Sequence, residues 1–475
     1  MDLIIKLLLG LGILIPLIIT AILPLAARPV LVTQARRQAF SARVANDRLS
    51  ELSALQTDLE FNPWSGETWQ RVGRLQLDLN QYSQAAASLE NAQIRGMLSI
   101  EGQTWLADAW ISSGDTEKAK QLLRNLSFDE EVDPFVFLQA ALIQRSIKDT
   151  NGALSTLLRA YEMAPENYEI NFQIGLLMAV EQPDKALPFL EQCARLKPES
   201  ADFCHSLAGE VAEKTEPGTY AVRLLSIGQI LSLNDEWDVA LLAFQKALDF
   251  EPQNGVIWAY TAEALQQNGQ NGSEAIAKAR ELAPEDEVVN GLSGLFYRRE
   301  GNSNEALKYF EKALEANPQG LVWEIEIANT FAEMGDLDAA LKHFEVATEI
   351  DPQNYLPWRA LAVFCLNHNF QITDIGLPAA RQSLELNQGS PALMDLLGTI
   401  LMASGVLDEA EIYFLQADQI DPRQTAILIH LGQLKLLQGE RELALDYFDQ
   451  AMEYAQDQRL FEAAQKLFYE NGGAD

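Results

Sequence analysis

The sequence predicts an all-α protein, a solenoid of antiparallel helix pairs preceded by one transmembrane helix. Three observations predict this class. An apolar run lies near the N-terminus, a layout of about 34 residues recurs eleven times after it, and small and aromatic residues return at fixed places within each copy. A fixed period indicates that neighbouring units stack into one continuous core, so the 475 residues measure the length of an array and not a number of domains.

The apolar run covers residues 3–27 and reads LIIKLLLGLGILIPLIITAILPLAA, with Lys6 as its only charge. A helix of this length exceeds a hydrocarbon core of roughly 30 Å. A cleaved signal peptide is the alternative, because residues 25–27 loosely resemble a cleavage site. The run is too long for a signal peptide, however, and Asp2 lies beside its start. We therefore expect residues 1–28 to be an uncleaved membrane anchor.

Positive charge flanks this run unevenly. Lys6 and the amino terminus lie at one end, whereas five arginines follow the other end: Arg28, Arg36, Arg37, Arg43 and Arg48. The positive-inside rule therefore predicts a single-pass protein of the cell membrane whose repeats lie on the cytoplasmic side.

Composition argues against two classes of protein. The chain has 35 basic and 68 acidic side chains, a net charge of −33, which is the wrong sign for a nucleic-acid binder. Three cysteines, Cys193, Cys204 and Cys365, are too few and too irregularly spaced for a disulfide framework or a zinc site. Each falls where a buried side chain is expected, so we interpret all three as small hydrophobic residues of the core.

Residues 29–63 are expected to form an amphipathic helix that links the anchor to the array and caps its first unit. Apolar side chains recur there at three- and four-residue spacing: Ala45, Leu49, Leu52, Leu55 and Leu59. Asn62 and Pro63 then end the helix.

The repeated layout begins near residues 66, 100, 134, 168, 221, 255, 287, 321, 355, 391 and 425. In each unit a small residue follows a large apolar one and lets two helices approach closely, as at Gly73, Gly175, Gly228, Gly398 and Gly432. Glycine also stands where a first helix must end, at Gly301, Gly335, Gly405 and Gly439.

The second helix of a unit carries Ala, an aromatic residue four positions on, and Ala three further on. Clear examples are Ala240, Phe244 and Ala247, then Ala306, Phe310 and Ala313, then Ala340, Phe344 and Ala347, then Ala410, Phe414 and Ala417. This spacing places all three side chains on one helical face. Proline then ends the helix, as at Pro165, Pro198, Pro252, Pro318, Pro352 and Pro422.

This pattern resembles the tetratricopeptide repeat. The resemblance covers residues 66–458 and implies antiparallel helix pairs in a right-handed superhelix, whose first helices line a concave groove. Residues 201–220 depart from it, since they offer a first helix and then Pro217 and Gly218. We therefore expect an N-terminal block over 66–200, an irregular half repeat over 201–220 and a C-terminal block over 221–458. Residues 459–475 are expected to be a capping helix and tail.

Catalytic patterns are absent from the sequence. It contains no glycine-rich phosphate loop, nucleophile elbow or metal motif. The four histidines, His205, His343, His368 and His430, are widely separated and have no ligand partner at helical spacing. We therefore expect no enzymatic activity, no cofactor, no bound metal and no small-molecule substrate.

The apolar run and the resemblance together predict a membrane-anchored protein-interaction scaffold or adaptor that binds one or more proteins or peptides in its concave groove. The alternative is a structural or assembly component of the cell envelope, an externally displayed array that associates with itself. The candidate groove is apolar and lies at Phe135, Leu138, Leu142, Phe172, Leu176, Val222, Leu225, Val256 and Tyr260. Exposed apolar stretches of this extent mark binding sites. The same side chains could equally be internal packing, and the sequence leaves both readings open.

Overall fold

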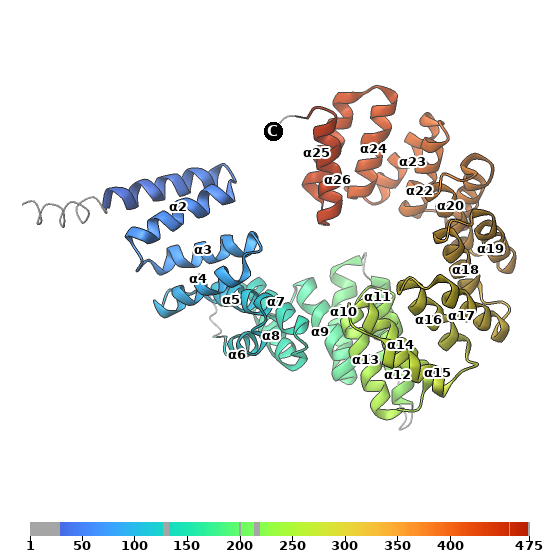
Figure 1. Ribbon diagram of the computed structural model, residues 1–475, viewed down its shortest axis with the longest axis horizontal. Coiled ribbons are helices and arrows are strands. Elements are labelled where there is room, and N and C mark those ends of the chain that lie inside the picture. The colour runs from blue at the N-terminus through green and yellow to red at the C-terminus, as the bar shows by residue number, and fades with distance from the viewer. Residues whose placement is uncertain (1–28, 127–132, 199–200, 213–218, 456, 474–475) are drawn as a thin grey trace, which may run out of the picture. The chain divides into compact units, whose positions relative to one another are not determined.

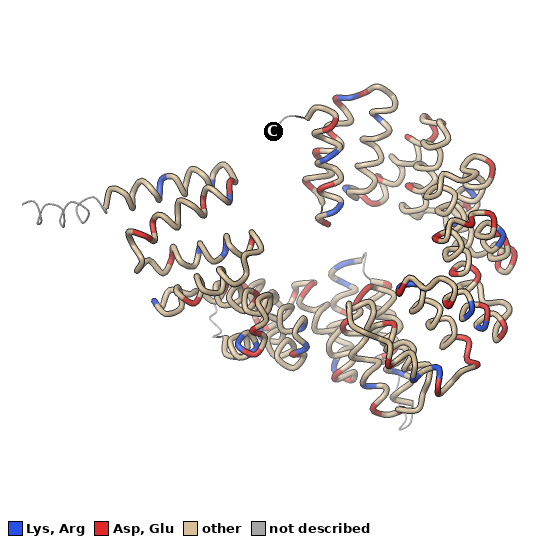
Figure 2. Tube along the Cα trace, viewed as in Figure 1, with Lys and Arg blue, Asp and Glu red and all other residues tan. Residues whose placement is uncertain are grey.

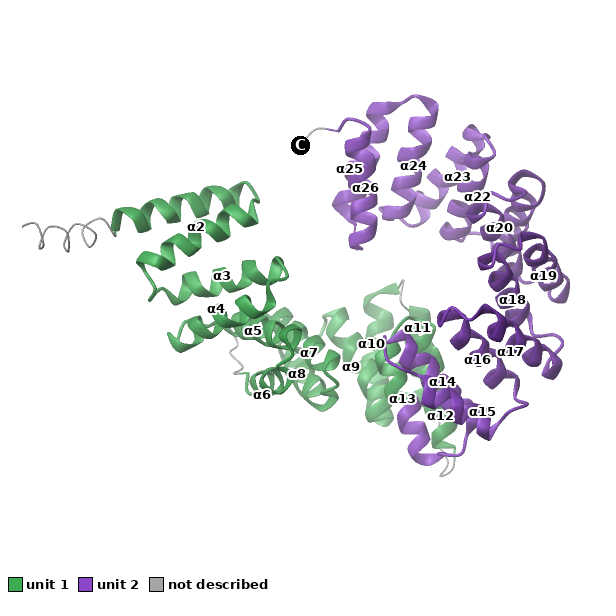
Figure 3. Ribbon diagram, in the orientation of Figure 1, with its two compact units in different colours: residues 1–243 green, residues 244–475 purple. Residues whose placement is uncertain are grey.

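The computed structural model describes residues 29–126, 133–198, 201–212, 219–455 and 457–473 (Figure 1). These residues are mainly helical, and none of them lies in a β-strand. The chain divides into two compact units, residues 1–243 and 244–475 (Figure 3). Within the described ranges, no helix combines the length and the apolar character needed to cross a bilayer. The anchor predicted at residues 1–28 lies outside the described residues.

A helical hairpin precedes the repeats, so the single amphipathic helix expected over residues 29–63 was wrong. Residues 29–44 form one helix and α2 (Arg48–Phe61) the next. The chain reverses at Asn46, whose φ of 53° lies in the left-handed region that asparagine tolerates. The first helix buries only Ala35 and Ala39, so the large apolar residues that carry a periodic signal all belong to α2.

The helices that follow confirm the repeat boundaries, because each first helix begins within one residue of its predicted start. The first helices are α3 (Gly66–Asp78), α5 (Ile100–Ser113), α7 (Pro134–Ser146), α9 (Tyr168–Glu181), α12 (Tyr220–Ser232), α14 (Gly255–Gln267), α16 (Glu287–Arg299), α18 (Leu321–Glu333), α20 (Tyr355–Asn367), α22 (Pro391–Ala403) and α24 (Thr425–Gln438). The second helices are α4 (Tyr82–Ile94), α6 (Thr116–Arg124), α8 (Thr150–Met163), α10 (Pro183–Leu196), α13 (Trp237–Phe250), α15 (Ser273–Leu282), α17 (Ser303–Ala316), α19 (Leu337–Ile350), α21 (Leu377–Leu386), α23 (Leu407–Ile420) and α25 (Arg441–Tyr454).

Several helix pairs bring the small residue of the first helix against the large residue of the second. A Cβ atom added to Gly398 would lie 2.6 Å from Cε1 of Phe414, and one added to Gly175 would lie 2.7 Å from Cδ2 of Leu190. The aromatic rings and their flanking alanines are fully buried, as expected from their shared face. The glycines that end first helices have positive φ, for example 84° at Gly335. Close approach of the two backbones therefore explains the glycine-and-aromatic pattern.

Three elements depart from regular pairing. The helix α11 (Ala201–Ala212) packs on α10, and the next described helix is α12. The unit that begins at α20 contains a π-helical turn, η2 (Ile372–Gly376), before α21, which accounts for its extra residues. The helix α26 (Gln458–Glu470) packs on α25 and ends the array.

The structure corrects the interpretation of two cysteines. Cys193 of α10 and Cys204 of α11 form a disulfide, with their Cα atoms 6.3 Å apart. Only Cys365 remains a free, buried thiol among the described residues, as expected for a small hydrophobic side chain. The repeat pattern gave no hint of the bond, because α11 lies outside the regular pairs and its neighbour could not be read from spacing.

Candidate functional site

The apolar positions predicted as a groove are not one exposed surface. Leu138 and Leu176 are only 1% and 0% exposed, and they belong to the core. Phe135 and Val222 are more than half exposed. The other five positions are partly exposed: Leu142, Phe172, Leu225, Val256 and Tyr260. Buried positions therefore interrupt the predicted stretch, and its last two residues belong to the second compact unit.

Phe172 shows how one of these positions is used in the structure. Its ring lies 5.6 Å from that of Tyr168 and 5.7 Å from that of Phe203, measured between centroids, and it packs beside Cys193 and Cys204. The irregular helix α11 thus takes up part of the surface that a regular first helix would leave open. The side chain of Phe172 therefore serves internal packing.

A different hollow lies on the first helices of the second unit. It has a volume of about 440 Å³ and is lined by side chains of α16, α18 and α20. Ile325, Val363 and Phe364 supply apolar surface, and Asn329 and Asn367 supply amides. We call this hollow the α18 groove.

The lining of the α18 groove repeats with the period of the sequence. Ile325 of α18 corresponds to Arg359 of α20, and Asn329 corresponds to Val363, in each case 34 residues apart. The groove is therefore built from equivalent positions of consecutive first helices. The resemblance stated above assigns partner binding to that face, and the structure places a hollow there.

Charged groups of both signs border the α18 groove. Arg298 forms an ion pair with Glu326, and its Nε lies 3.8 Å from Oε1 of Glu333. Arg359 is exposed, and no ion pair joins it to the described part of the chain. The ring of His368 lies 5.4 Å from that of Phe364, between centroids. A carboxylate entering the groove would therefore meet an available guanidinium.

This arrangement suits binding of an extended chain. An asparagine amide both donates and accepts hydrogen bonds, so it can pair with a peptide unit, while apolar surface between the amides can take side chains. The lining has no Ser, Thr, Cys or Lys side chain that could serve as a nucleophile. Across the described ranges, no group of three His, Cys, Asp or Glu side chains is placed to hold a metal ion.

Sequence reasoning missed the α18 groove because it searched for apolar runs. The usable signal was Asn329, Arg359 and Asn367 on predicted first helices, polar residues at positions that do not pack within the repeat. Polar side chains at equivalent positions are weaker signals than apolar ones, since most solvated helix faces carry them.

Comparison with known proteins supports the type of repeat. Residues 297–367, from the end of α16 to the end of α20, match the family model of the tetratricopeptide repeat. This stretch includes most of the α18 groove. These residues therefore carry tetratricopeptide repeats, and the other described helix pairs share their layout.

Individual relatives are distant. Human protein O-mannosyl-transferase TMTC1 is 23% identical over 188 residues, which cover 38% of this chain and 21% of the relative. The chain thus spans about a fifth of the length of this curated relative. The crystal structure of yeast Tom70 is similar over 93% of this chain and 95% of its own, with 16% identity and a TM-score of 0.44. The structure of YrrB is similar over 41% of this chain and 99% of its own, with 24% identity and a TM-score of 0.32.

Proposed function

We propose that this protein is a membrane-anchored scaffold that holds an extended segment of a partner protein in the α18 groove. The observation that carries the proposal is the lining of the groove, which combines the amides of Asn329 and Asn367 with apolar side chains of two consecutive first helices, α18 and α20. Amide side chains can pair with the donors and acceptors of a peptide backbone, and the apolar surface between them can take its side chains. Binding without catalysis is part of the proposal, and the lining has no Ser, Thr, Cys or Lys side chain.

The proposed anchor is residues 3–27. Its support is the length of the apolar run and the single charge within it. Five arginines after the run favour a cytoplasmic array. Extraction of the full chain from membranes with alkaline carbonate tests the anchor, because a spanning helix stays with the lipid and a peripheral protein is released.

The alternative, an externally displayed envelope component, is favoured by the bond between Cys193 and Cys204. Disulfides persist in oxidising compartments and are rare in the cytosol. In the cytoplasmic orientation that we propose, the same two side chains face each other as thiols. Whether Cys193 and Cys204 are oxidised or reduced in cells therefore distinguishes the external envelope component from the cytoplasmic scaffold.

Site-directed photocrosslinking tests the α18 groove. A photoreactive residue in place of Val363 should crosslink a partner in native membranes, and one in place of Lys342, on the exposed face of α19, should not. The crosslinked segment, mapped by mass spectrometry, should be extended and not part of a folded surface.

A double variant checks the role of the amides. Asn329→Ala with Asn367→Ala should reduce the crosslink at least about tenfold, since each lost hydrogen bond contributes roughly 1 kcal/mol. The melting temperature should be unchanged, because Asn367 is exposed and Asn329 is partly exposed. Equal crosslinking from the Lys342 position, or full crosslinking in the double variant, would contradict the proposal.

A further inference from the structure

The first helix, residues 29–44, leaves an apolar and basic face uncovered by the described residues. Its inner face packs through Ala35 and Ala39. On the outer face Val30 is 67% exposed, Phe40 67% and Val44 72%. Val30 and Val44 stand seven residues to either side of Arg37, so all three lie on one side of the helix. Apolar residues exposed to this degree on one short helix indicate an interaction surface.

The charge of this segment is opposite to that of the array. Between residues 28 and 48 there are five arginines and one acidic residue, Asp47, whereas beyond residue 60 there are 29 basic and 63 acidic side chains. Acidic residues are spread along the helices of both units (Figure 2). Arg37 makes no hydrogen bond or ion pair with the part of the chain that the structure describes. The first helix is therefore a basic segment of an acidic protein, complementary to an anionic partner.

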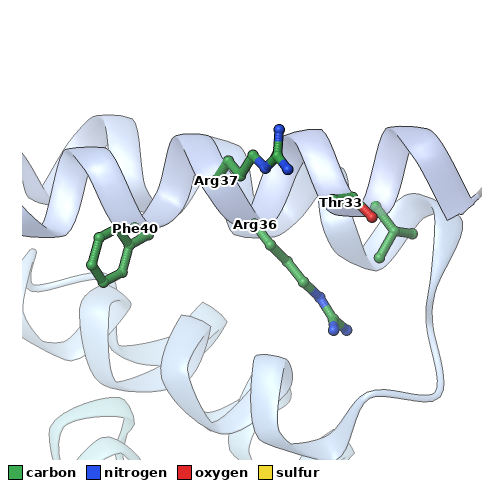
Figure 4. A pocket seen from close by; sticks show the side chains of 5 residues that line it. Thr33, Arg36, Arg37 and Phe40 are labelled. Atoms are coloured by element: carbon green, nitrogen blue, oxygen red, sulfur yellow. The ribbon is translucent and has the colours of Figure 1, made fainter.

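A shallow hollow of about 540 Å³ lies on this helix and is lined by Val32, Thr33, Arg36, Arg37 and Phe40. Figure 4 shows Arg36 and Phe40 bordering this hollow along one edge and Arg37 along the other. Guanidinium groups bind phosphate through bidentate hydrogen bonds, and a neighbouring aromatic ring and Val32 offer apolar contact. This combination fits a phosphate that is joined to hydrocarbon chains.

Ion pairs between arginines and buried carboxylates hold the face in a fixed position. Nε of Arg43 lies 2.8 Å from Oε1 of Glu51, and Nε of Arg71 lies 2.9 Å from the same oxygen. Glu51 is on α2 and Arg71 on α3, so the first helix is tied through the hairpin to the first repeat. Arg36 makes a similar bond to the buried Asp58, 3.2 Å from Nε to Oδ1. The packed hairpin therefore keeps the outer face of the first helix in a fixed position.

We propose that the outer face of the first helix lies on a membrane of anionic phospholipid, with Phe40 and Val44 among the acyl chains and Arg37 at the phosphates. This inference rests on the proposed anchor, because the apolar run ends at residue 27, two residues before the helix. A helix that starts there starts at the bilayer surface. Amphipathic helices with basic and aromatic residues bind in that plane, and basic residues next to a span favour anionic lipid.

Spin labelling of the full chain tests the inference. Phe40→Cys carries the label, and the chain is reconstituted in phosphatidylcholine vesicles with or without phosphatidylglycerol. We expect the label to be shielded from a water-soluble nickel reagent and accessible to oxygen when phosphatidylglycerol is present. A label on Lys342→Cys, exposed on α19, should remain in water in both vesicles.

Charge variants separate lipid recognition from folding. In the labelled Phe40→Cys chain, the further substitution Arg37→Gln should lower the ratio of membrane-bound to free first helix about fivefold. This is the effect expected for the loss of one basic residue near an anionic surface. Lys466→Gln, on exposed α26, should leave the ratio unchanged. Equal shielding in both vesicles would show that the helix does not recognise anionic lipid, and a label that stays accessible to the nickel reagent in both would show that the face does not enter the membrane; either result would overturn the inference. Release of the chain by carbonate would instead contradict the anchor, so the two failures are distinguishable.

Discussion

Arg145 and Asp238 are 93 positions apart in the chain, and the guanidinium donates two hydrogen bonds to the carboxylate, both 2.6 Å long. The same guanidinium pairs with Glu236 and donates to the side-chain oxygen of Gln173, 2.6 Å from Nη1. Arg145 lies on α7, Gln173 on α9, and Glu236 between α12 and α13. Helix pairs in solenoids contact only their immediate neighbours as a rule, so this cluster joins parts of the first unit that the rule would leave separate.

Arg145→Met should loosen this region. The side chain of Arg145 is only 16% exposed, and its loss leaves Glu236 partly buried without a cation. We expect a loss of about 2 kcal/mol, between the values for exposed and fully buried pairs. Hydrogen exchange in α7 and α9 should accelerate about thirtyfold. Lys466→Met, which removes an exposed pair with Glu470, is the matched control and should change exchange by less than about twofold. Unaltered exchange in Arg145→Met would mean that the cluster is not a stabilising one.

The docking of the N-terminal hairpin should depend on pH through Glu51. Burial alone would raise the pKa of Glu51, but hydrogen bonds and charges from Arg71 and Arg43 outweigh it and hold the pKa below its ordinary value of 4.5. A lowered carboxyl pKa stabilises the folded state above the unfolded value, and this contribution is lost as the pH falls below 4.5.

Hydrogen exchange of residues 29–61 measured at falling pH, after correction for the intrinsic rate, should show this loss. Glu51→Gln should make the hairpin less stable at neutral pH and weaken its dependence on pH below 4.5, leaving the part that comes from Asp47, whose pKa is lowered by hydrogen bonds from Ser50. Glu60→Gln, at an exposed position of α2, should keep the dependence. If Glu51→Gln retained the full pH dependence, another group would be responsible.

Two glycines in helices should respond to alanine in opposite ways. Gly398→Ala places a Cβ 2.6 Å from the Phe414 ring and should cost about 1–3 kcal/mol through overpacking. Gly209→Ala in α11 meets nothing within 4 Å and should be neutral or stabilise by up to about 1 kcal/mol. Chemical unfolding of both variants measures the difference. Comparable effects would contradict the close-approach explanation of the pattern.

Serine substitutions should separate core from surface among the positions first assigned to a groove. Leu176→Ser should cost about 3 kcal/mol or more, because the side chain is fully buried. Phe135→Ser should change stability by less than about 0.5 kcal/mol, because more than half of the ring is exposed. Thermal unfolding of the two variants gives the comparison, and a tolerant Leu176 site would restore the original groove.

Cysteine alkylation after rapid acid quenching of cells should reveal whether the repeats lie on the cytoplasmic or the external side of the membrane. In the proposed cytoplasmic orientation, Cys193, Cys204 and Cys365 all react with a mass-tagged maleimide once the chain is denatured. In the external orientation only Cys365 reacts until a reductant is added. Burial raises the pKa of the Cys365 thiol to about 11, so this residue should resist alkylation before denaturation in both cases.

The regular part of the fold could be predicted from the sequence because one physical cause repeats in it. Gly398 leaves room for the ring of Phe414, and the same contact between a glycine and a large side chain recurs in other helix pairs. The pattern is therefore repeated many times along the sequence. The hairpin at Asn46, the disulfide between Cys193 and Cys204, and the Arg145 cluster each occur once. Each depends on contacts between segments that only the tertiary fold brings together. The spacing of residues within one segment does not predict such contacts. The α18 groove was missed for a related reason, because its polar lining resembles any solvated helix face.

The turn η2 shows how the array accommodates a change of chain length. The extra residues lie between α20 and α21, where Gln371 has a φ of 46°, and Gly376 leads into α21. The helices that follow, α22 and α23, again form a regular pair with Phe414 buried against Gly398. A segment that absorbs added residues without disturbing its neighbours is a natural point of insertion. An epitope or fluorescent domain placed after Gln371 should therefore leave the later repeats intact.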